Sequence, residues 1–217
     1  MNKLAPIVLY CHGLGATARS GTALLAKKFV ESRGLQFKSI EYGKFEDKNY
    51  VWNVDDWLND LLMNIDECSK QQRSSLLFGK LRWSAGCHSI LRATLLKPQA
   101  ICGLMLLSPG VGLNLKSYIR AVMPHFWEDI CADKKVPHPT TAKHFPPIMV
   151  NRQCLQHFVD IVPLLNVEKF KKKLESKDVI LSVINGSGHY LPFAAEFEEL
   201  FDSLLSSVQR TDDNRIL

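Results

Sequence analysis

The chain has 217 residues, 46% of them hydrophobic, so it can bury a core as a single folded domain without disulfide staples. Its net charge of +5 comes from scattered lysines and arginines, clustered only at 171–173, which argues against nucleic-acid binding. The six cysteines form no C-x-x-C pair, which favours reduced thiols inside a cell, and no apolar run approaches the roughly 18 residues of a membrane span.

The first strand is expected over residues 6–11, a continuous β-prone run typical of a strand buried on both faces of a parallel sheet. A His-Gly-Leu-Gly turn follows at 12–15 and can aim the backbone N–H of Leu14 above the sheet edge, as an oxyanion donor requires. An ordinary strand-to-loop turn is the alternative. An amphipathic helix at 21–33, a strand at 36–42 and a helix from about 53 to 70 are expected next.

A third strand, expected at 75–81, runs through Ser84 into a helix expected at 86–96. This is the pattern of a nucleophile elbow, in which a serine on a tight turn presents its hydroxyl and the next residue, here Ala85, directs its N–H at the reacting oxygen. The positions two residues to either side of the serine should be small. Gly86 meets this requirement and Arg82 does not. Without residues 80–82 the stretch would read Gly-Trp-Ser-Ala-Gly, so we interpret these three residues as an insertion.

A fourth apolar strand is expected at 100–107, and the alternation of strands and helices predicts an α/β fold: a mostly parallel sheet flanked by helices. The apolar and aromatic stretch that follows predicts a short cap insertion at about 110–146 within a single domain, 1–217. We expect Met123, Phe126 and Trp127 to line an acyl-sized pocket, with plain core packing as the alternative.

Residues 148–151 are expected to return to the sheet, a helix is expected at 166–175 and a last strand at 178–184, before a Gly/Ser loop with His189. A closing helix is expected at 194–207, and residues 209–217 are expected to fray.

Ser84, Asp160 and His189 occur in the chain order of the α/β-hydrolase triad, each expected just beyond a strand. In such a triad a neutral imidazole takes the serine proton, and the carboxylate fixes the tautomer of the imidazole and stabilises its charge. Cys87 is an alternative nucleophile because it too is flanked by small residues, although a buried thiol also explains it.

Metal and cofactor sites are not indicated. The seven histidines lack H-E-x-x-H or Cys/His ligand spacing, and we expect His138 and His144 at the surface of a cap loop. No glycine-rich phosphate motif follows a strand, which argues against a nucleotide-binding protein. The expectation is therefore no metal and no cofactor.

Nearly the whole chain resembles the α/β-hydrolase superfamily, and within it the small depalmitoylating and acyl-glucuronide-cleaving hydrolases of mitochondria. Residues 82–98 match the elbow and following helix of that group without a gap, with Ser84 on the nucleophile. Residues 160–163 resemble its acid loop, and residues 178–189 resemble its last strand and histidine loop.

The chain differs from that group at three points: Arg82 replaces a glycine, the cap is much shorter, and the usual acid position is Val159, one residue before Asp160. If the loop at 154–160 bulges by one residue, Asp160 can still reach His189. Otherwise the protein would be a weak hydrolase, since loss of the triad carboxylate lowers turnover by about four orders of magnitude.

The resemblance implies a serine hydrolase that cleaves carboxylic esters or thioesters, acyl-protein thioesters included, through an acyl-enzyme. A catalytically impaired relative that binds a ligand or a protein is the alternative. The partner is then a small-molecule or acyl-protein substrate, and the oligomeric state stays open. The resemblance points to mitochondria, but residues 1–6 are too short for a transit peptide before the first strand, so we expect a cytoplasmic location.

Overall fold

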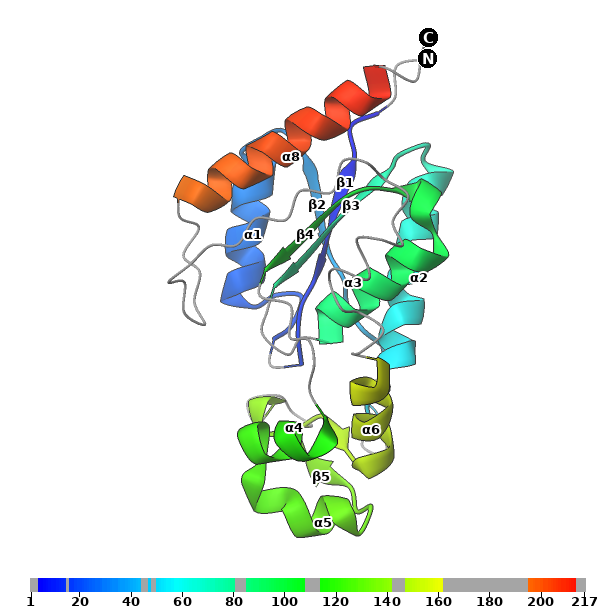
Figure 1. Ribbon diagram of the computed structural model, residues 1–217. Coiled ribbons are helices and arrows are strands. Elements are labelled where there is room, and N and C mark those ends of the chain that lie inside the picture. Colours follow the sequence, from blue (N-terminus) through cyan, green and yellow to red (C-terminus); the bar gives the residue numbers. More distant parts are fainter. Residues whose placement is uncertain are drawn as a thin grey trace.

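The computed structural model (Figure 1) describes residues 4–14, 16–43, 47, 50–80, 85–107, 114–141, 147–161 and 195–213. Among these residues four parallel strands form the main sheet in the order β2-β1-β3-β4. They are β1 (Ile7–Cys11), β2 (Gln36–Ser39), β3 (Ser75–Lys80) and β4 (Ile101–Leu107). The predicted parallel sheet flanked by helices is confirmed. The helix and strand predicted at 166–175 and 178–184 lie outside the described residues.

Helices cover both faces of this sheet (Figure 1). The helices α1 (Gly21–Glu31) and α8 (Ala195–Asp213) lie on one face, and α2 (Val54–Lys70) and α3 (Ala85–Leu96) lie on the other. In β1, Ile7, Leu9 and Cys11 pack in the core on the α2 and α3 side, whereas Val8 and Tyr10 pack on the α1 and α8 side. Successive side chains point to opposite faces of a strand, which explains why the apolar run of β1 is continuous.

Local signals in the sequence set the helix ends. The side chain of Ser20 accepts a hydrogen bond from the Ala23 N–H at the start of α1, and Asn53 accepts one from the Asp55 N–H at 2.9 Å at the start of α2. Such caps satisfy backbone donors that have no partner within the helix. Gly34 follows α1 with a φ of 72°, a left-handed conformation that favours glycine.

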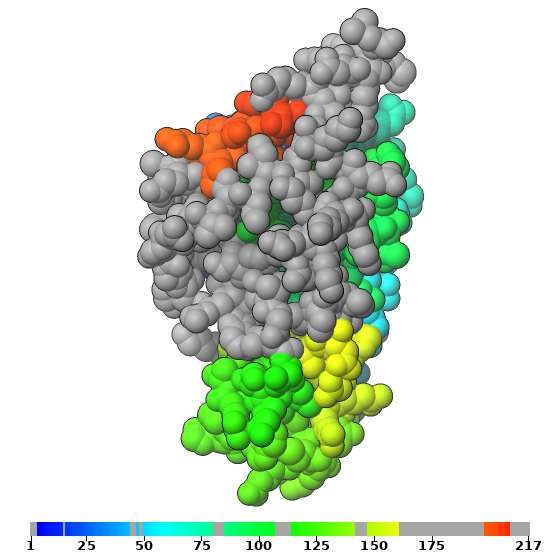
Figure 2. Space-filling model, viewed as in Figure 1, coloured from blue at the N-terminus to red at the C-terminus, as the bar shows by residue number. Residues whose placement is uncertain are grey.

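Beyond the carboxyl ends of the strands lies a group of short elements (Figure 1), which also forms the lower end of the molecule in Figure 2. After the 3-10 turn η1 (Pro98–Ala100) and β4, the chain forms α4 (Leu115–Val122), η2 (Pro124–Phe126), α5 (Trp127–Cys131), β5 (Val136–Pro137), η3 (Pro139–Thr141), β6 (Met149–Val150) and α6 (Arg152–Ile161). The elements from α4 to η3 occupy the described part of the region predicted to be a cap, about 110–146, and β6 and α6 follow it.

Two sequence predictions for this group are wrong. The strand β6 does not rejoin the main sheet but pairs antiparallel with β5, because a strand of two residues finds its partner in the neighbouring short segment. His138 is buried rather than at the surface, and its two ring nitrogens lie 2.8 Å from the Tyr118 and Thr140 hydroxyl oxygens. A buried imidazole needs such partners, and spacing along the chain does not reveal them. His144 lies outside the described residues.

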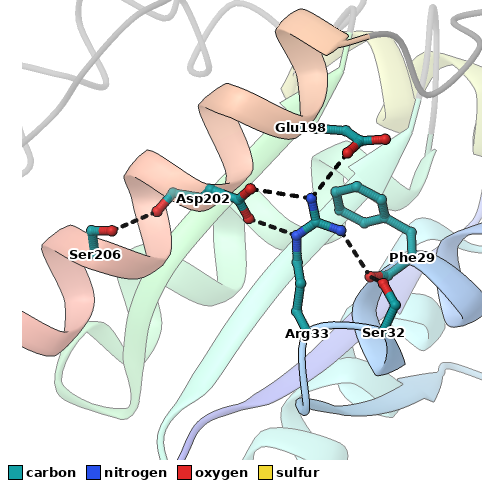
Figure 3. Close-up of polar contacts among 6 residues, drawn as sticks. All are labelled: Phe29, Ser32, Arg33, Glu198, Asp202 and Ser206. Carbon is teal, nitrogen blue, oxygen red and sulfur yellow. Dashed lines mark hydrogen bonds and ion pairs between the residues drawn. The ribbon is translucent and has the colours of Figure 1, made fainter.

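The helix α8 is held to the end of α1 by Arg33 (Figure 3). The guanidinium of Arg33 donates to the Asp202 carboxylate at 2.6 and 3.2 Å and to Glu198 at 3.3 Å, and it lies 3.8 Å from the centre of the Phe29 ring. A bidentate ion pair over an aromatic face is a strong surface contact. The prediction that the chain frays from residue 209 is wrong for residues 209–213, which continue α8.

Candidate active site

Some of the residues predicted to form the active site belong to the described part of the chain and others do not. Ser84, His189 and Arg82 lie outside the described residues. Ala85, Leu14, Asp160 and the three predicted pocket residues are described. The structural evidence for an elbow therefore comes from its flanks, β3 and α3.

Those flanks have the form that an elbow requires. The strand β3 ends at Lys80 in the middle of the sheet, and α3 begins at Ala85, directly after the predicted nucleophile. A Cβ atom added to Gly86 would lie 2.5 Å from the His12 carbonyl oxygen and 2.6 Å from the Cys11 carbonyl oxygen. The first turn of α3 thus lies against the end of β1 at a separation that only glycine permits.

This close approach also brings together the two segments that contain the predicted oxyanion donors, Leu14 and Ala85. Leu14 follows the end of β1 by three residues, and Ala85 is the first residue of α3; both are buried. Since Gly86 touches the backbone of Cys11 and His12, the donors belong to segments that meet at one edge of the sheet. A pair of backbone N–H groups from two such segments is the usual form of an oxyanion hole.

Replacing Gly86 with alanine is expected to lower the free energy of unfolding by at least about 2 kcal/mol, because the new methyl group would meet backbone atoms rather than a flexible side chain. The measurement is urea unfolding of the purified variants. Gly21→Ala is the matched control, since nothing lies within 4 Å of its added Cβ at the start of α1; it should be neutral or stabilise by up to about 1 kcal/mol. Equal effects at the two sites would contradict the tight junction.

The alternative nucleophile, Cys87, faces the interior. It is 2% exposed, and its Sγ lies 3.1 Å from the position of a Cβ added to Gly79 of β3. A catalytic thiol is partly exposed in an environment that stabilises the thiolate. The position of Cys87 between strand and helix is that of a buried apolar side chain.

Asp160 lies in the last turn of α6, ten residues after β6, rather than just beyond a strand as its place in a triad would suggest. The buried face of α6 carries Leu155, Phe158 and Val159. Asp160 is exposed on another face, where its Oδ1 accepts a hydrogen bond from the Gln156 side chain at 2.6 Å.

Asp160 borders an open surface cleft of about 550 Å³. The cleft is lined by polar and charged residues only: Asp133, Arg152, Gln153, Gln156, His157 and Asp160. The predicted acyl-pocket residues lie elsewhere: Met123 is buried in the core with Phe126 packed against that core, and Trp127 is 37% exposed.

A network that the sequence analysis missed joins three helices next to this cleft. The Asp55 carboxylate at the start of α2 accepts hydrogen bonds from Arg92 of α3 and, at 2.9 Å, from Nε2 of His157 of α6. Burial raises the pKa of Asp55, but the hydrogen bonds from Arg92 and His157 outweigh it and hold the pKa below its ordinary value. No spacing along the chain connects residues 55, 92 and 157, so only the tertiary structure reveals the network.

His88 lies one turn into α3, is 2% exposed and packs with its ring centre 4.5 Å from that of Phe158. Its Nδ1 has no hydrogen-bond partner within the described part of the chain. Burial, and to a smaller extent the charge of Arg92, lowers the pKa of His88 to about 4, and burial alone does the same for His138. Both imidazoles are therefore neutral in the folded protein at neutral pH.

These two histidines make the fold sensitive to acid. In the unfolded chain each of these imidazoles takes up a proton near pH 6.5, and in the folded chain only near pH 4. The free energy of unfolding should therefore decrease as the pH is lowered from 6.5 to 4, by roughly 3 kcal/mol for each histidine. Because its Nδ1 has no partner among the described residues, His88→Leu should remove its share of this pH dependence at little cost at pH 7. Urea unfolding at pH 7 and pH 4.5 tests this; an unchanged pH dependence in His88→Leu would contradict it.

Within the described ranges, no group of three or more His, Cys, Asp or Glu side chains is placed to hold a metal ion. Nor does any helix of the described residues have the length and apolar character to cross a membrane.

No protein-family model matches the sequence, and no curated protein matches it. Solved structures do match. Alpha/beta hydrolase domain-containing protein 10 from mouse superposes with a TM-score of 0.62 at 15% identity, over 99% of this chain and 92% of that chain. A monoacylglycerol lipase from Paleococcus ferrophilus superposes with a TM-score of 0.65 at 17% identity, over 93% of this chain and 96% of that chain. These likenesses show that the chain has the α/β-hydrolase fold, so the predicted fold is confirmed.

Proposed function

We propose that the protein is a serine hydrolase of carboxylic esters or thioesters. Ser84 is its nucleophile, His189 its general base and Asp160 the acid that orients the histidine. The single observation that carries the proposal is the junction at Gly86, where α3 approaches the end of β1 too closely for any side chain. An elbow needs this junction, whereas an ordinary strand-to-helix connection does not.

The proposed reaction follows from these roles. His189 takes the proton of Ser84 as the serine oxygen attacks the substrate carbonyl, and the N–H groups of Leu14 and Ala85 stabilise the negative oxygen that forms. Collapse of this intermediate expels the alcohol or thiol, which receives the proton from His189. Water then attacks the acyl-enzyme: His189 takes a proton from the water and returns it to the Ser84 oxygen as the acid product leaves.

The structural comparisons support an ester as the bond that is cleaved, because the neighbour from Paleococcus ferrophilus is named a monoacylglycerol lipase. A thioester differs from an ester in its leaving group and passes through the same kind of tetrahedral intermediate, so the proposed site suits both. We include acyl-protein thioesters in the substrate class on the sequence resemblance alone. The cytoplasmic location stays a prediction from the sequence.

A fluorophosphonate probe tests the proposal, since it reacts with serines that a neighbouring base activates. We expect the purified wild-type protein to be labelled, and peptide mass spectrometry to find the probe on Ser84. Heat-denatured protein is the control. Labelling elsewhere, or none at all, would show that Ser84 is not an activated nucleophile.

The acyl-pocket hypothesis makes a separate prediction. If Met123, Phe126 and Trp127 line a pocket for an acyl chain, hydrolysis of nitrophenyl esters should become faster as the chain is lengthened beyond acetate, because each buried CH₂ contributes about 0.8 kcal/mol. Trp127 is the most exposed of the three, so Trp127→Ala should reduce this gain without unfolding the protein. Rates that stay constant or decrease with chain length would contradict the acyl-pocket hypothesis but not the proposed triad.

One observation favours a second function, that of a catalytically impaired relative which binds a ligand or a protein. Asp160 is exposed on α6 and hydrogen-bonded to Gln156, a position that a surface carboxylate can occupy without any catalytic role. The probe separates the two functions, because an impaired relative without an activated serine would not be labelled.

A further inference from the structure

The helix α6, which carries the proposed triad acid, is held to the rest of the molecule in two ways. On its buried face the ring centre of Phe158 lies 5.4 Å from that of Trp52 and 4.5 Å from that of His88. On its exposed face the contacts are polar: His157 binds Asp55 of α2, and the Gln153 backbone N–H donates to Asp133. Apolar packing resists separation but tolerates small rotations of a helix, whereas a hydrogen bond to a fixed carboxylate defines its orientation.

Asp55 is itself fixed in place. It lies in the first turn of α2, where its backbone N–H donates to the Asn53 side chain at 2.9 Å and its negative charge is favoured by the helix dipole. Its Oδ1 accepts from Arg92, which lies two turns along α3 from the proposed elbow, and its Oδ2 accepts from His157. One carboxylate therefore connects the helix that leaves the elbow with the helix that bears the acid.

We propose that Asp55 is a positioning residue, which fixes the orientation of α6 relative to α3 by binding Arg92 and His157 with one carboxylate. His157 and Asp160 are three residues apart on the same side of α6 and border the same cleft. A rotation of α6 that broke the His157 contact would displace Asp160 as well. This role rests on the proposed function, and it explains why the acid can act from a helix rather than from a loop after a strand.

The test is ester turnover in matched variants. Asp55→Asn should lower kcat about 10- to 100-fold, the loss typical of a catalytic group misplaced by about 1 Å, and should change KM less than threefold. His157→Ala should match it. His157→Gln should keep most of the activity, because the amide nitrogen of glutamine can still donate to Asp55.

Two controls address general effects of removing a charge. Asp56→Asn removes the neighbouring carboxylate from the same first turn of α2, where it binds the Tyr50 hydroxyl instead. Asp66→Asn removes an ion pair between α2 and Lys97, the residue directly after α3, and this ion pair does not involve α6. Both variants should keep kcat within threefold of wild type. A loss in either one equal to that in Asp55→Asn would overturn the specific role of Asp55.

A double-mutant cycle shows whether Asp55 acts through Asp160. In an Asp160→Asn background, Asp55→Asn should lower kcat less than twofold further, because the group that it positions is already lost. Hydrogen exchange should show faster amide exchange in α6 for Asp55→Asn than for Asp66→Asn. An equal loss in both backgrounds, or unchanged exchange in α6, would overturn the proposal.

The outcomes separate this proposal from the proposed function. If the wild-type protein hydrolyses esters and is labelled at Ser84, but Asp55→Asn stays within threefold of its kcat, the positioning role alone is wrong. If the wild type neither hydrolyses esters nor reacts with the probe, the positioning role and the proposed function are both wrong.

Discussion

Replacing Ser84 with alanine is expected to lower ester turnover by about 10⁶-fold, the loss that follows removal of a triad nucleophile. The remaining activity would come from binding and from the oxyanion donors of Leu14 and Ala85, which the substitution leaves in place. The measurement is steady-state hydrolysis of a nitrophenyl ester at pH 7.5, with circular dichroism to verify that the variant is folded. The loss should appear in kcat, with little change in KM.

Cys87→Ala is the control for the other candidate nucleophile. Because Cys87 is buried between β3 and α3, its replacement should reduce stability by a small cavity effect and leave turnover within a fewfold of wild type. Loss of turnover in Cys87→Ala together with retention in Ser84→Ala would make the thiol the nucleophile and would refute our assignment.

The second large effect is expected at Asp160. Asp160→Asn should lower turnover by roughly 10³- to 10⁴-fold, because an amide holds the imidazole of His189 in the wrong tautomer and cannot stabilise its positive charge. The fold should be unaffected, since the Asp160 side chain is exposed and its hydrogen-bond partner is the neighbouring Gln156. Steady-state turnover and a thermal melt measure the two effects.

Asp133→Asn is the matched control for Asp160→Asn. Asp133 borders the same cleft from a different segment, and its carboxylate accepts only the Gln153 backbone N–H at 3.3 Å among its described hydrogen bonds. Its replacement should leave turnover within threefold. If Asp160→Asn behaves in the same way, the carboxylate belongs to the surface of α6, and the triad acid is elsewhere or absent.

The order of the elements could be predicted because each depends on local signals. The β1 run from Ile7 to Cys11 is apolar throughout, as a strand covered on both faces must be, and the caps Ser20 and Asn53 define the starts of α1 and α2. The alternation of such segments leads to a parallel sheet, because parallel strands need a crossover between them. The prediction was wrong at 148–151, where the segment is too short for its own pattern to choose between two sheets.

At the predicted elbow, the sequence by itself determined the residue types: a serine after the third strand, followed two residues later by a glycine. Why that position must be glycine was decided by the tertiary structure, in which the carbonyl oxygens of Cys11, at the end of β1, and of His12, directly after it, lie within 2.6 Å of any added Cβ. The tertiary structure alone also placed Asp160 on the exposed side of α6 and joined Asp55, Arg92 and His157. Periodicity and capping act over a few residues, whereas contacts between helices far apart in the chain depend on how the whole core packs.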